Sequence, residues 1–213
     1  MPEALRPNPP RRYPGDPAVA AAKAALRATI RAARRTPEPF GSAARRTAAA
    51  LRLCAGHEMI ALYCSIGDEP DTWPLIDALS AAGRTVLLPV LGRRSDGTVR
   101  REPDWAEYAG RDALRVGYAS IAEPVGEPLG PDGLQRATLV WCSALAATSR
   151  GDRLGTGGGW YDRALTHASP DALLGVLLRD DEVLSRLPLE DFDRRVDVIV
   201  TDLRTIRAVD GPE

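Results

Sequence analysis

A glycine-rich segment at residues 153–163 combines the side chains and the backbone pattern best suited to chemistry. It reads Arg-Leu-Gly-Thr-Gly-Gly-Gly-Trp-Tyr-Asp-Arg, with four glycines in five consecutive positions. Because glycine lets the backbone bend freely and approach a ligand closely, the amides of such a loop, followed by a helix N-terminus, form a phosphate-binding site. Arg153 and Arg163 can pair with phosphate oxygens. The structural alternative is a tight turn in which the glycines only relieve crowding.

This segment matches neither common nucleotide-binding fingerprint. It lacks the Gly-Lys-Ser/Thr ending of a Walker A loop, and Trp160 stands where a Rossmann pattern has its third glycine or alanine. A phosphate bound at this loop would repel the carboxylate of Asp162 unless a cation lay between the two. Asp162 is therefore a candidate Mg²⁺ ligand, the alternative being a first-turn acid that the helix dipole favours.

Lys23 is the only lysine among the 28 basic residues, and all the others are arginine. Where charge alone matters, arginine has replaced lysine, so a retained lysine indicates a need for a compact ammonium group. Lys23 and Arg27 lie one helical turn apart and can reach one polyphosphate. The alternative is a chance survivor on the solvated basic stripe of a helix, formed by Lys23, Arg27, Arg31 and Arg34.

Composition excludes several classes of protein. The 213 residues carry a net charge of −1, with 44% hydrophobic and 27% charged residues, which is typical of a globular chain and not of a nucleic-acid binder. We expect no membrane partner, since no apolar run is long enough to span one, and no secretory signal. Three separated cysteines (Cys54, Cys64 and Cys142) predict reduced thiols in a cytoplasmic protein. The expected state is a monomer acting on small molecules.

The elements that position these residues follow from periodicity and capping signals. Asp16-Pro17 predicts the start of a helix that ends near Arg35. Further helices are predicted at 36–56, 72–82 and 159–167, and buried strands at 59–65, 84–90, 137–143, 173–178 and 196–201. Residues 91–103 are interpreted as a turn and a short edge strand, and residues 104–136 mostly as loops.

Apolar strands separated by helices predict an α/β fold. We expect a Rossmann-like three-layer arrangement, with a mostly parallel sheet and helices on both faces, in a single domain over residues 18–213. Six prolines in residues 1–17 predict a flexible tail before it. The glycine-rich loop follows strand 137–143, so it lies at the carboxyl edge of the sheet, where open α/β sheets bind ligands.

The segment 153–163 resembles the Arg-Leu-Gly-x-Gly-x-Gly-x-Tyr-Asp signature of the 5-formyltetrahydrofolate cyclo-ligases, also called methenyltetrahydrofolate synthetases. Weaker motifs of that family are matched in order along almost the whole chain after the tail. They are Lys23-x-x-Leu26-Arg27, 65–72 (Ser-Ile-Gly-Asp-Glu-Pro-Asp-Thr), Ile121-Ala122-Glu123-Pro124, Ala144-Leu145-Ala146 and 192–197 (Phe-Asp-Arg-Arg-Val-Asp).

The resemblance implies an enzyme that uses ATP and Mg²⁺ to convert 5-formyltetrahydrofolate to 5,10-methenyltetrahydrofolate, releasing ADP and phosphate. It implies catalytic roles for Lys23 and Arg153, and Mg²⁺ ligands at Asp162 and Asp193. The implied ATP-binding residues are Lys23, Arg27, Arg153, Leu154, Gly155, Thr156, Gly157, Gly158, Gly159, Trp160 and Tyr161. The implied folate-binding residues are Cys64, Glu69, Thr156, Gly157, Gly158, Gly159 and Trp160.

Two candidate folate-site residues, Glu69 and Trp105, are weighed against other roles, and three positions depart from the family pattern. Glu69 can hydrogen-bond an amino-pyrimidine edge or be a solvated loop acid, and Trp105 is either a wall of the folate pocket or a surface residue. The departures are Trp160 for the usual tyrosine, Thr148 for an aspartate and Phe192 for a histidine. Trp160 keeps an aromatic face, whereas Thr148 and Phe192 alter local contacts.

The chemistry that the family performs suits a chain without a Ser-His-Asp constellation. A formamide oxygen is a poor leaving group, and phosphorylation of that oxygen allows the neighbouring nitrogen to close the ring. Such a transfer needs positioning and neutralisation of charge more than a protein nucleophile. Two alternatives remain: a different ATP-dependent enzyme on the same scaffold, and a non-catalytic protein that binds nucleotide or folate.

Overall fold

A seven-stranded sheet, in the order β12-β11-β9-β6-β1-β2-β3, forms the centre of the molecule. The computed structural model describes residues 16–92, 97–98, 100, 102–190 and 193–209. The inner strands are parallel, whereas both edge strands pair antiparallel with their neighbours. The bounds, in sheet order, are β12 (Thr205–Arg207), β11 (Val198–Val200), β9 (Leu173–Leu177), β6 (Leu139–Cys142), β1 (Met59–Ala61), β2 (Thr85–Pro89) and β3 (Trp105–Glu107).

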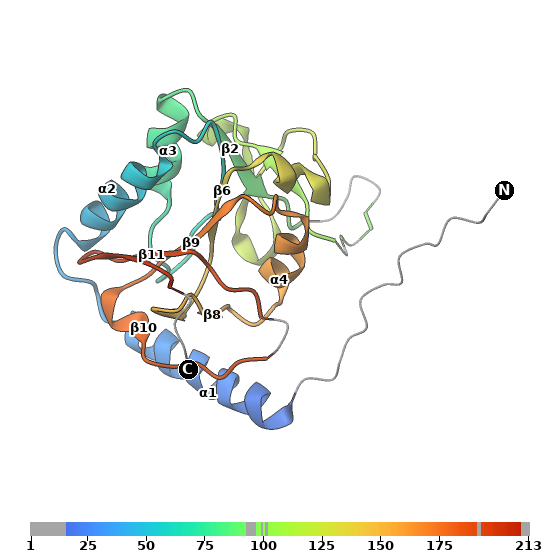
Figure 1. Ribbon diagram of the computed structural model, residues 1–213. Helices are drawn as coiled ribbons and strands as arrows, with labels where there is room; N and C mark the ends of the chain where they lie inside the picture. Colours follow the sequence, from blue (N-terminus) through green and yellow to red (C-terminus); the bar gives the residue numbers. More distant parts are fainter. Residues whose placement is uncertain (1–15, 93–96, 99, 101, 191–192, 210–213) are drawn as a thin grey trace.

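Helices cover both faces of this sheet, because successive strand residues point to opposite sides. Ile60 and Trp141 belong to the core under α2 (Ser42–Cys54) and α3 (Trp73–Ala81). Ala61 and Cys142 belong to the core under α4 (Trp160–Ala164) and η4 (Leu165–His167). Figure 1 shows α2 and α3 on one side of the strands and α4 on the other. The expected α/β class, with a mostly parallel sheet and helices on both faces, is confirmed.

Helix α1 (Pro17–Arg34) lies against a second, smaller sheet in place of the central one (Figure 1). This sheet has the order β10-β7-β8, formed by Val183–Leu184, Ala146–Thr148 and Arg153–Leu154. Ile30 of α1 packs with Leu145 and Leu154 in a small apolar cluster. The predicted start of α1 is confirmed, because Asp16 accepts a hydrogen bond from the amide of Ala18 at 2.8 Å.

The segment between β2 and β6 contains more regular structure than the sequence predicts. Residues 104–136, predicted to be mostly loops, include β3 and an antiparallel hairpin of β4 (Leu114–Val116) with β5 (Ala122–Pro124). The 3₁₀ turns η1 (Arg111–Ala113), η2 (Tyr118–Ser120) and η3 (Pro131–Arg136) lie between these strands, and η5 (Asp180–Glu182) follows β9. Strands of three residues are too short for period-two alternation to identify them.

Two further predictions about boundaries are wrong. The second helix begins at Ser42 and not at residue 36, because Gly41 before it has φ 83° and ends the non-helical stretch that contains Pro37 and Pro39. The edge strand expected within 91–103 lies at Trp105–Glu107. The tail proposed for 1–17 falls outside the described residues up to position 15.

Candidate active site

The glycine-rich loop connects the small sheet to helix α4 at the carboxyl edge of the central sheet. Arg153 and Leu154 form strand β8, so the loop itself covers residues 155–159. Gly157 and Gly159 have φ values of 109° and 60°, a region that side-chain-bearing residues rarely adopt. These glycines therefore allow the chain to turn from β8 into α4 within a few residues.

The basic stripe of α1 holds this loop in place. Arg27 donates from Nε to the carbonyl oxygen of Gly155 at 2.9 Å, and Arg31 donates to that of Thr156 at 2.8 Å. A Cβ on Gly157 would lie 3.4 Å from Arg27 Nε. Arg31 matches no family motif, yet it contacts the loop as closely as Arg27 does. The stripe is a contact surface for the loop as well as a source of positive charge.

A cavity of about 180 Å³, here called the loop cavity, lies between α1 and the loop. Two ion pairs form among its lining residues. Lys23 Nζ lies 2.5 Å from an oxygen of Asp193, and a guanidinium nitrogen of Arg153 lies 2.5 Å from an oxygen of Asp162. The lining residues are Lys23, Arg27, Ser143, Arg153, Leu154, Gly155, Thr156, Gly157, Gly159, Trp160, Tyr161, Asp162 and Asp193. The structure thus brings together cations and acids from four separate segments.

The polar groups of the loop cavity suit a phosphate with a divalent cation. Arg153 Nε is buried and has no hydrogen-bond partner among the described residues, which leaves one donor for an anion. The N-cap of α4 is Gly159, which has no side chain to cap the helix, and Asp162 in the first turn accepts a hydrogen bond from Arg153. Within the described residues no group of three or more His, Cys, Asp or Glu could hold a metal ion. Two carboxylates fit Mg²⁺, which proteins bind through one or two carboxylates together with phosphate oxygens and water.

A larger cavity of about 540 Å³, here called the open cavity, lies on the other side of the same loop. Its lining residues are Arg31, Arg34, Arg35, Tyr63, Cys64, Ile66, Asp68, Glu69, Pro89, Leu91, Ile121, Ser143, Leu145, Thr156, Trp160 and Tyr161. Burial raises the pKa of the Glu69 carboxyl, although Oε2 accepts a hydrogen bond from the amide of Ile66 at 3.1 Å. Burial also raises the pKa of the Cys64 thiol to about 12, so Cys64 is an apolar wall and not a nucleophile.

Aromatic rings separate the two cavities. Trp160 and Tyr161 line both of them, with ring centroids 4.9 Å apart in an edge-to-face arrangement. Trp105 contacts Trp160 from behind, at 5.1 Å between centroids. Trp105 has no exposed surface, so the alternative that it is a surface residue is wrong, and it is absent from the lining of both cavities. Its place in the core fixes the orientation of Trp160.

Other predicted residues lie apart from the cavities. Gly158 and Arg163 line neither one, and Arg163 donates to the carbonyl oxygen of Gly158 at 3.3 Å. Thr148, where the family has an aspartate, is the buried last residue of β7 and donates to Asp152 at 2.7 Å. Phe192 lies outside the described residues.

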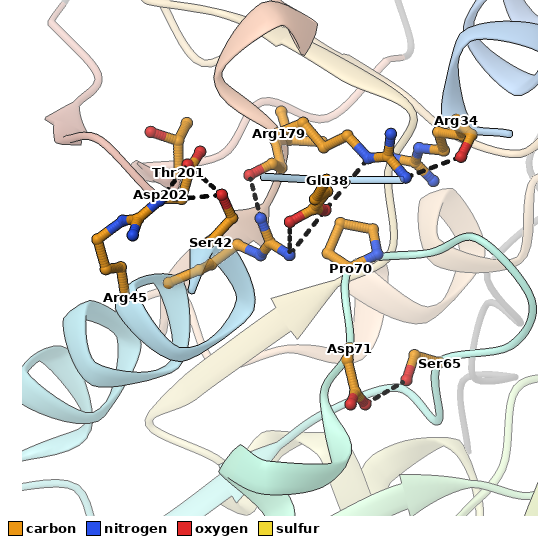
Figure 2. Close-up of polar contacts among 12 residues, drawn as sticks. Arg34, Glu38, Ser42, Arg45, Ser65, Pro70, Asp71, Arg179, Thr201 and Asp202 are labelled. Atoms are coloured by element: carbon orange, nitrogen blue, oxygen red, sulfur yellow. Dashed lines mark hydrogen bonds and ion pairs between the residues drawn. The ribbon is translucent and has the colours of Figure 1, made fainter. Parts of the chain in front are cut away.

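Buried ion pairs hold the end of α1 beside the open cavity, and no local sequence pattern predicts them. Arg34 pairs with Glu182 through bonds of 2.6 and 2.9 Å and donates to the carbonyl oxygen of Ala144 at 2.9 Å. Figure 2 shows Arg179 reaching the carbonyl oxygen of Arg34, at 2.8 Å, and Glu38. Tyr63 and Ser143, at the ends of the runs that contain β1 and β6, also went unpredicted as lining residues.

Fold and site together define an α/β protein with a glycine-rich loop between two cavities at the carboxyl edge of a parallel sheet. The model of the 5-formyltetrahydrofolate cyclo-ligase family matches residues 19–202. The chain belongs to that family.

Relatives and solved structures agree with this assignment. The chain is 32% identical to the 5-formyltetrahydrofolate cyclo-ligase of Mycolicibacterium smegmatis over 150 residues, which cover 70% of this chain and 76% of the relative. It is also 32% identical to that of Escherichia coli K12 over 143 residues, with coverage of 67% and 76%. The NMR structure of Aquifex aeolicus 5,10-methenyltetrahydrofolate synthetase superposes with a TM-score of 0.71 at 27% identity, over 90% of this chain and 95% of that one. A Mycoplasma pneumoniae synthetase, at 17% identity and a TM-score of 0.64, shares the fold over 84% of this chain and 98% of that one.

Proposed function

We propose that this protein uses ATP and Mg²⁺ to convert 5-formyltetrahydrofolate to 5,10-methenyltetrahydrofolate, with release of ADP and phosphate. The observation that carries the proposal is the wall that the two cavities share. Ser143, Thr156, Trp160 and Tyr161 line both cavities, so ligands in the two would meet at this wall. A reaction between a nucleotide and a second substrate requires such a meeting point.

The loop cavity is the proposed nucleotide site. Lys23, Arg27 and Arg153 supply positive charge, and residues 154–157 and 159–161 supply the backbone around the phosphates. The ion pairs of Lys23 with Asp193 and of Arg153 with Asp162 keep the cations in place before phosphate arrives. Preorganised charges of this kind stabilise the charge that develops during phosphoryl transfer without reorganisation at the moment of reaction.

Asp162 and Asp193 are the proposed ligands of Mg²⁺. Their carboxylates line the same cavity as Lys23 and Arg153. In the proposed site, Mg²⁺ would become the partner of the two carboxylates, and the phosphates would become the partners of Lys23 and Arg153. When bound, Mg²⁺ would neutralise negative charge on the phosphate oxygens. The protein's own task is to hold each carboxylate beside one cation until then.

The open cavity is the proposed folate site. Glu69 presents two acceptor oxygens for an amino-pyrimidine edge, while Cys64 and Trp160 provide apolar surface beside it. Thr156 and Gly157 lie where the two sites approach each other. Trp105 acts indirectly, because it contacts Trp160 and not the cavity.

The proposed reaction needs no nucleophile from the protein. The formyl oxygen attacks the γ-phosphoryl group of ATP, and ADP leaves. The neighbouring N–H nitrogen of the folate then attacks the formyl carbon and gives up its proton to the departing phosphate or to water, and the carbon–oxygen bond breaks as phosphate leaves with that oxygen. Lys23 and Arg153 hold the transferring group, which needs positioning and neutralisation of its charge.

The remaining expectations are part of the same proposal. The protein is proposed to act as a monomer on small molecules. Cys54, Cys64 and Cys142 are buried and free, which supports a reducing, cytoplasmic location. Among the helices of the described residues, none has the length and apolar character needed to cross a membrane. Residues 18–213 are proposed to act as a single domain.

The proposal is tested by following two products together. Protein, Mg-ATP and 5-formyltetrahydrofolate are mixed, and ADP and the absorbance spectrum are recorded over time. Ring closure creates a conjugated amidinium that absorbs at longer wavelength than the substrate, so the new band and ADP should appear in equal amounts. ADP without the band would indicate a different ATP-dependent enzyme, and neither signal would indicate a non-catalytic binding protein.

A further inference from the structure

One buried carboxylate joins the β4–β5 hairpin to the end of β2. Glu123, in β5, has only 1% of its side chain exposed. Its Oε2 accepts hydrogen bonds from the amides of Leu91 and Gly92, both at 2.7 Å, and its Oε1 accepts one from Arg115 Nε at 2.8 Å. A buried carboxylate is costly unless donors surround it, and here three donors from two segments do so.

Two glycines shape the space that this carboxylate occupies. A Cβ on Gly92 would lie 2.5 Å from Glu123 Oε1, and a Cβ on Gly117 would lie 2.6 Å from Oε2. Gly117 has φ −98°, a value that any residue adopts. Glycine at this position therefore avoids a steric clash with Glu123 and is not required by the backbone conformation. Gly92 and Gly117 therefore leave room for the Glu123 carboxylate, whereas a side chain at either position would overlap it.

The joined segments form one wall of the open cavity. Leu91, whose amide bonds Glu123, lines that cavity, as does Ile121 at the other end of the hairpin tip. The tip is closed by a bond of 2.8 Å from the amide of Gly117 to the carbonyl oxygen of Ile121. Ala119 and Ser120 within it have φ values of 52° and 64°, which cost energy in residues other than glycine. The Glu123 charge also contributes to the raised pKa of Cys64, another residue of this wall.

We propose that Glu123 is a positioning residue that sets the distance between Leu91 and Ile121 and thereby the affinity for the folate. The inference rests on the proposed function, because it takes the open cavity as the folate site. Glu123 itself lines neither cavity and acts through the two apolar side chains beside it. Since it makes no contact with the loop cavity, its replacement should affect the folate and not the nucleotide.

The first test is Glu123→Gln, with Asp152→Asn as the matched control. Glutamine keeps the shape of Glu123 but turns an NH₂ group toward donors. Asp152 is an equally buried carboxylate, bonded to Thr148 and Arg195 and outside both cavities. Equilibrium titration of 5-formyltetrahydrofolate without ATP, and KM values for both substrates, are measured for each variant. We expect about tenfold weaker folate binding and a matching rise in folate KM for Glu123→Gln, with ATP KM within about twofold.

A second pair of variants leaves every charge in place. Gly117→Ala puts a methyl group against the Glu123 carboxylate, whereas Gly126→Ala on the same side of the fold meets only a carbonyl oxygen at 3.8 Å. We expect weaker folate binding for Gly117→Ala alone. This pair decides the question if Glu123→Gln does not fold.

The outcomes separate this inference from the proposed function. Wild-type protein that binds the folate without cyclising it would overturn the proposed function, while the titrations would still compare the variants. The role of Glu123 is overturned if Glu123→Gln, or Gly117→Ala in its place, binds the folate as tightly as wild type. It is also overturned if the Asp152→Asn and Gly126→Ala controls lose folate affinity to the same extent, or if wild type binds no folate.

Discussion

At the scale of single residues, the loop cavity balances each acid with a cation. Lys23 pairs with Asp193 and Arg153 with Asp162, and both cations are largely buried, with 11% and 3% of their side chains exposed. A buried charge needs an opposite charge or a ligand, so each partner satisfies the other, and in the proposed function metal and phosphate would replace these partners. The predictions that follow replace one member of such a pair at a time.

Replacing Lys23 by Arg should weaken the use of ATP. The guanidinium keeps the charge but is wider than the ammonium group, and Lys23 Nζ already lies 2.5 Å from Asp193. We expect ATP KM to rise about tenfold, the equivalent of about 1.4 kcal/mol, with little change in folate KM. Steady-state kinetics with each substrate varied in turn provide the measurement.

Arg52→Lys is the control, because Arg52 is exposed on α2, which covers the opposite face of the sheet from the loop. Arg31 does not serve as a control, since it bonds the loop carbonyl of Thr156. Wild-type ATP kinetics in Lys23→Arg would show that the single lysine has no special role.

Replacing Asp162 by Asn should increase the requirement for Mg²⁺. Asparagine can still accept the hydrogen bond from Arg153, but it coordinates a divalent cation less well. Turnover should fall and recover in part at high Mg²⁺, while the free energy of unfolding drops by about 1 kcal/mol. Asp132→Asn, at an exposed site beside His167, is the control and should leave the Mg²⁺ requirement and the free energy of unfolding unchanged. A large loss of stability with an unaltered Mg²⁺ requirement would assign Asp162 to the fold alone.

Glu69 should make folate binding depend on pH. Burial raises the pKa of this carboxyl, so it takes up a proton at higher pH than an exposed glutamate does. Only the ionised form offers two acceptor oxygens, so folate affinity should decrease as pH falls through the raised pKa. Titrations between about pH 8 and pH 4 would follow this. Glu69→Gln should bind more weakly at neutral pH and lose this component of the pH dependence; an unchanged pH profile in Glu69→Gln would contradict the prediction.

At the scale of elements, α1 is attached mainly through polar contacts. Ile30 is its one buried apolar residue, whereas Lys23, Arg27, Arg31 and Arg34 each bond another segment. The position of α1, and with it the position of Lys23, therefore depends on a few charged side chains. The pair of Arg34 with Glu182 is the most buried of these contacts, with 3% and 5% exposed.

Removing Glu182 should destabilise the protein and displace α1. Glu182→Ala leaves the Arg34 guanidinium buried without its counter-charge, which should cost about 3 kcal/mol of unfolding free energy. ATP KM should rise as well, since α1 carries Lys23 and Arg27. Urea unfolding and steady-state kinetics measure the two effects. Glu107→Ala, which removes an exposed ion pair with Arg136, should cost less than about 1 kcal/mol.

The sequence predicted the elements that repeat a strong pattern and missed those set by tertiary contacts. The inner parallel strands and α1 were predicted because their apolar periods and the Asp16-Pro17 cap are local signals. Strands β7, β8 and β10 have two or three residues, and only their pairing in the small sheet defines them. Likewise, Lys23, Asp162 and Asp193 were found by motif, whereas the bond between Arg34 and Glu182 joins residues far apart in the chain.

At the scale of the whole molecule, the two cavities share a wall, and the proposed function places one ligand on each side of it. Trp160 and Tyr161 face both, and Trp160 is supported from the core by Trp105. A ligand in either cavity restricts the same segment, residues 156–161, so the second ligand meets a loop that is already ordered. The second ligand therefore does not repeat the free-energy cost of ordering the loop.

The two substrates should therefore bind cooperatively. We expect a non-hydrolysable ATP analogue to tighten the binding of 5-formyltetrahydrofolate by about fivefold or more, and the folate to tighten the analogue by the same factor. Calorimetric titration of each ligand, with and without the other at saturation, measures both factors. Trp160→Leu removes the ring that contacts Trp105 and Tyr161 and should reduce the coupling more than it reduces the affinity for the analogue alone. Two factors equal to one would mean that the cavities bind independently, and the shared wall would then serve only to bring the reacting groups together.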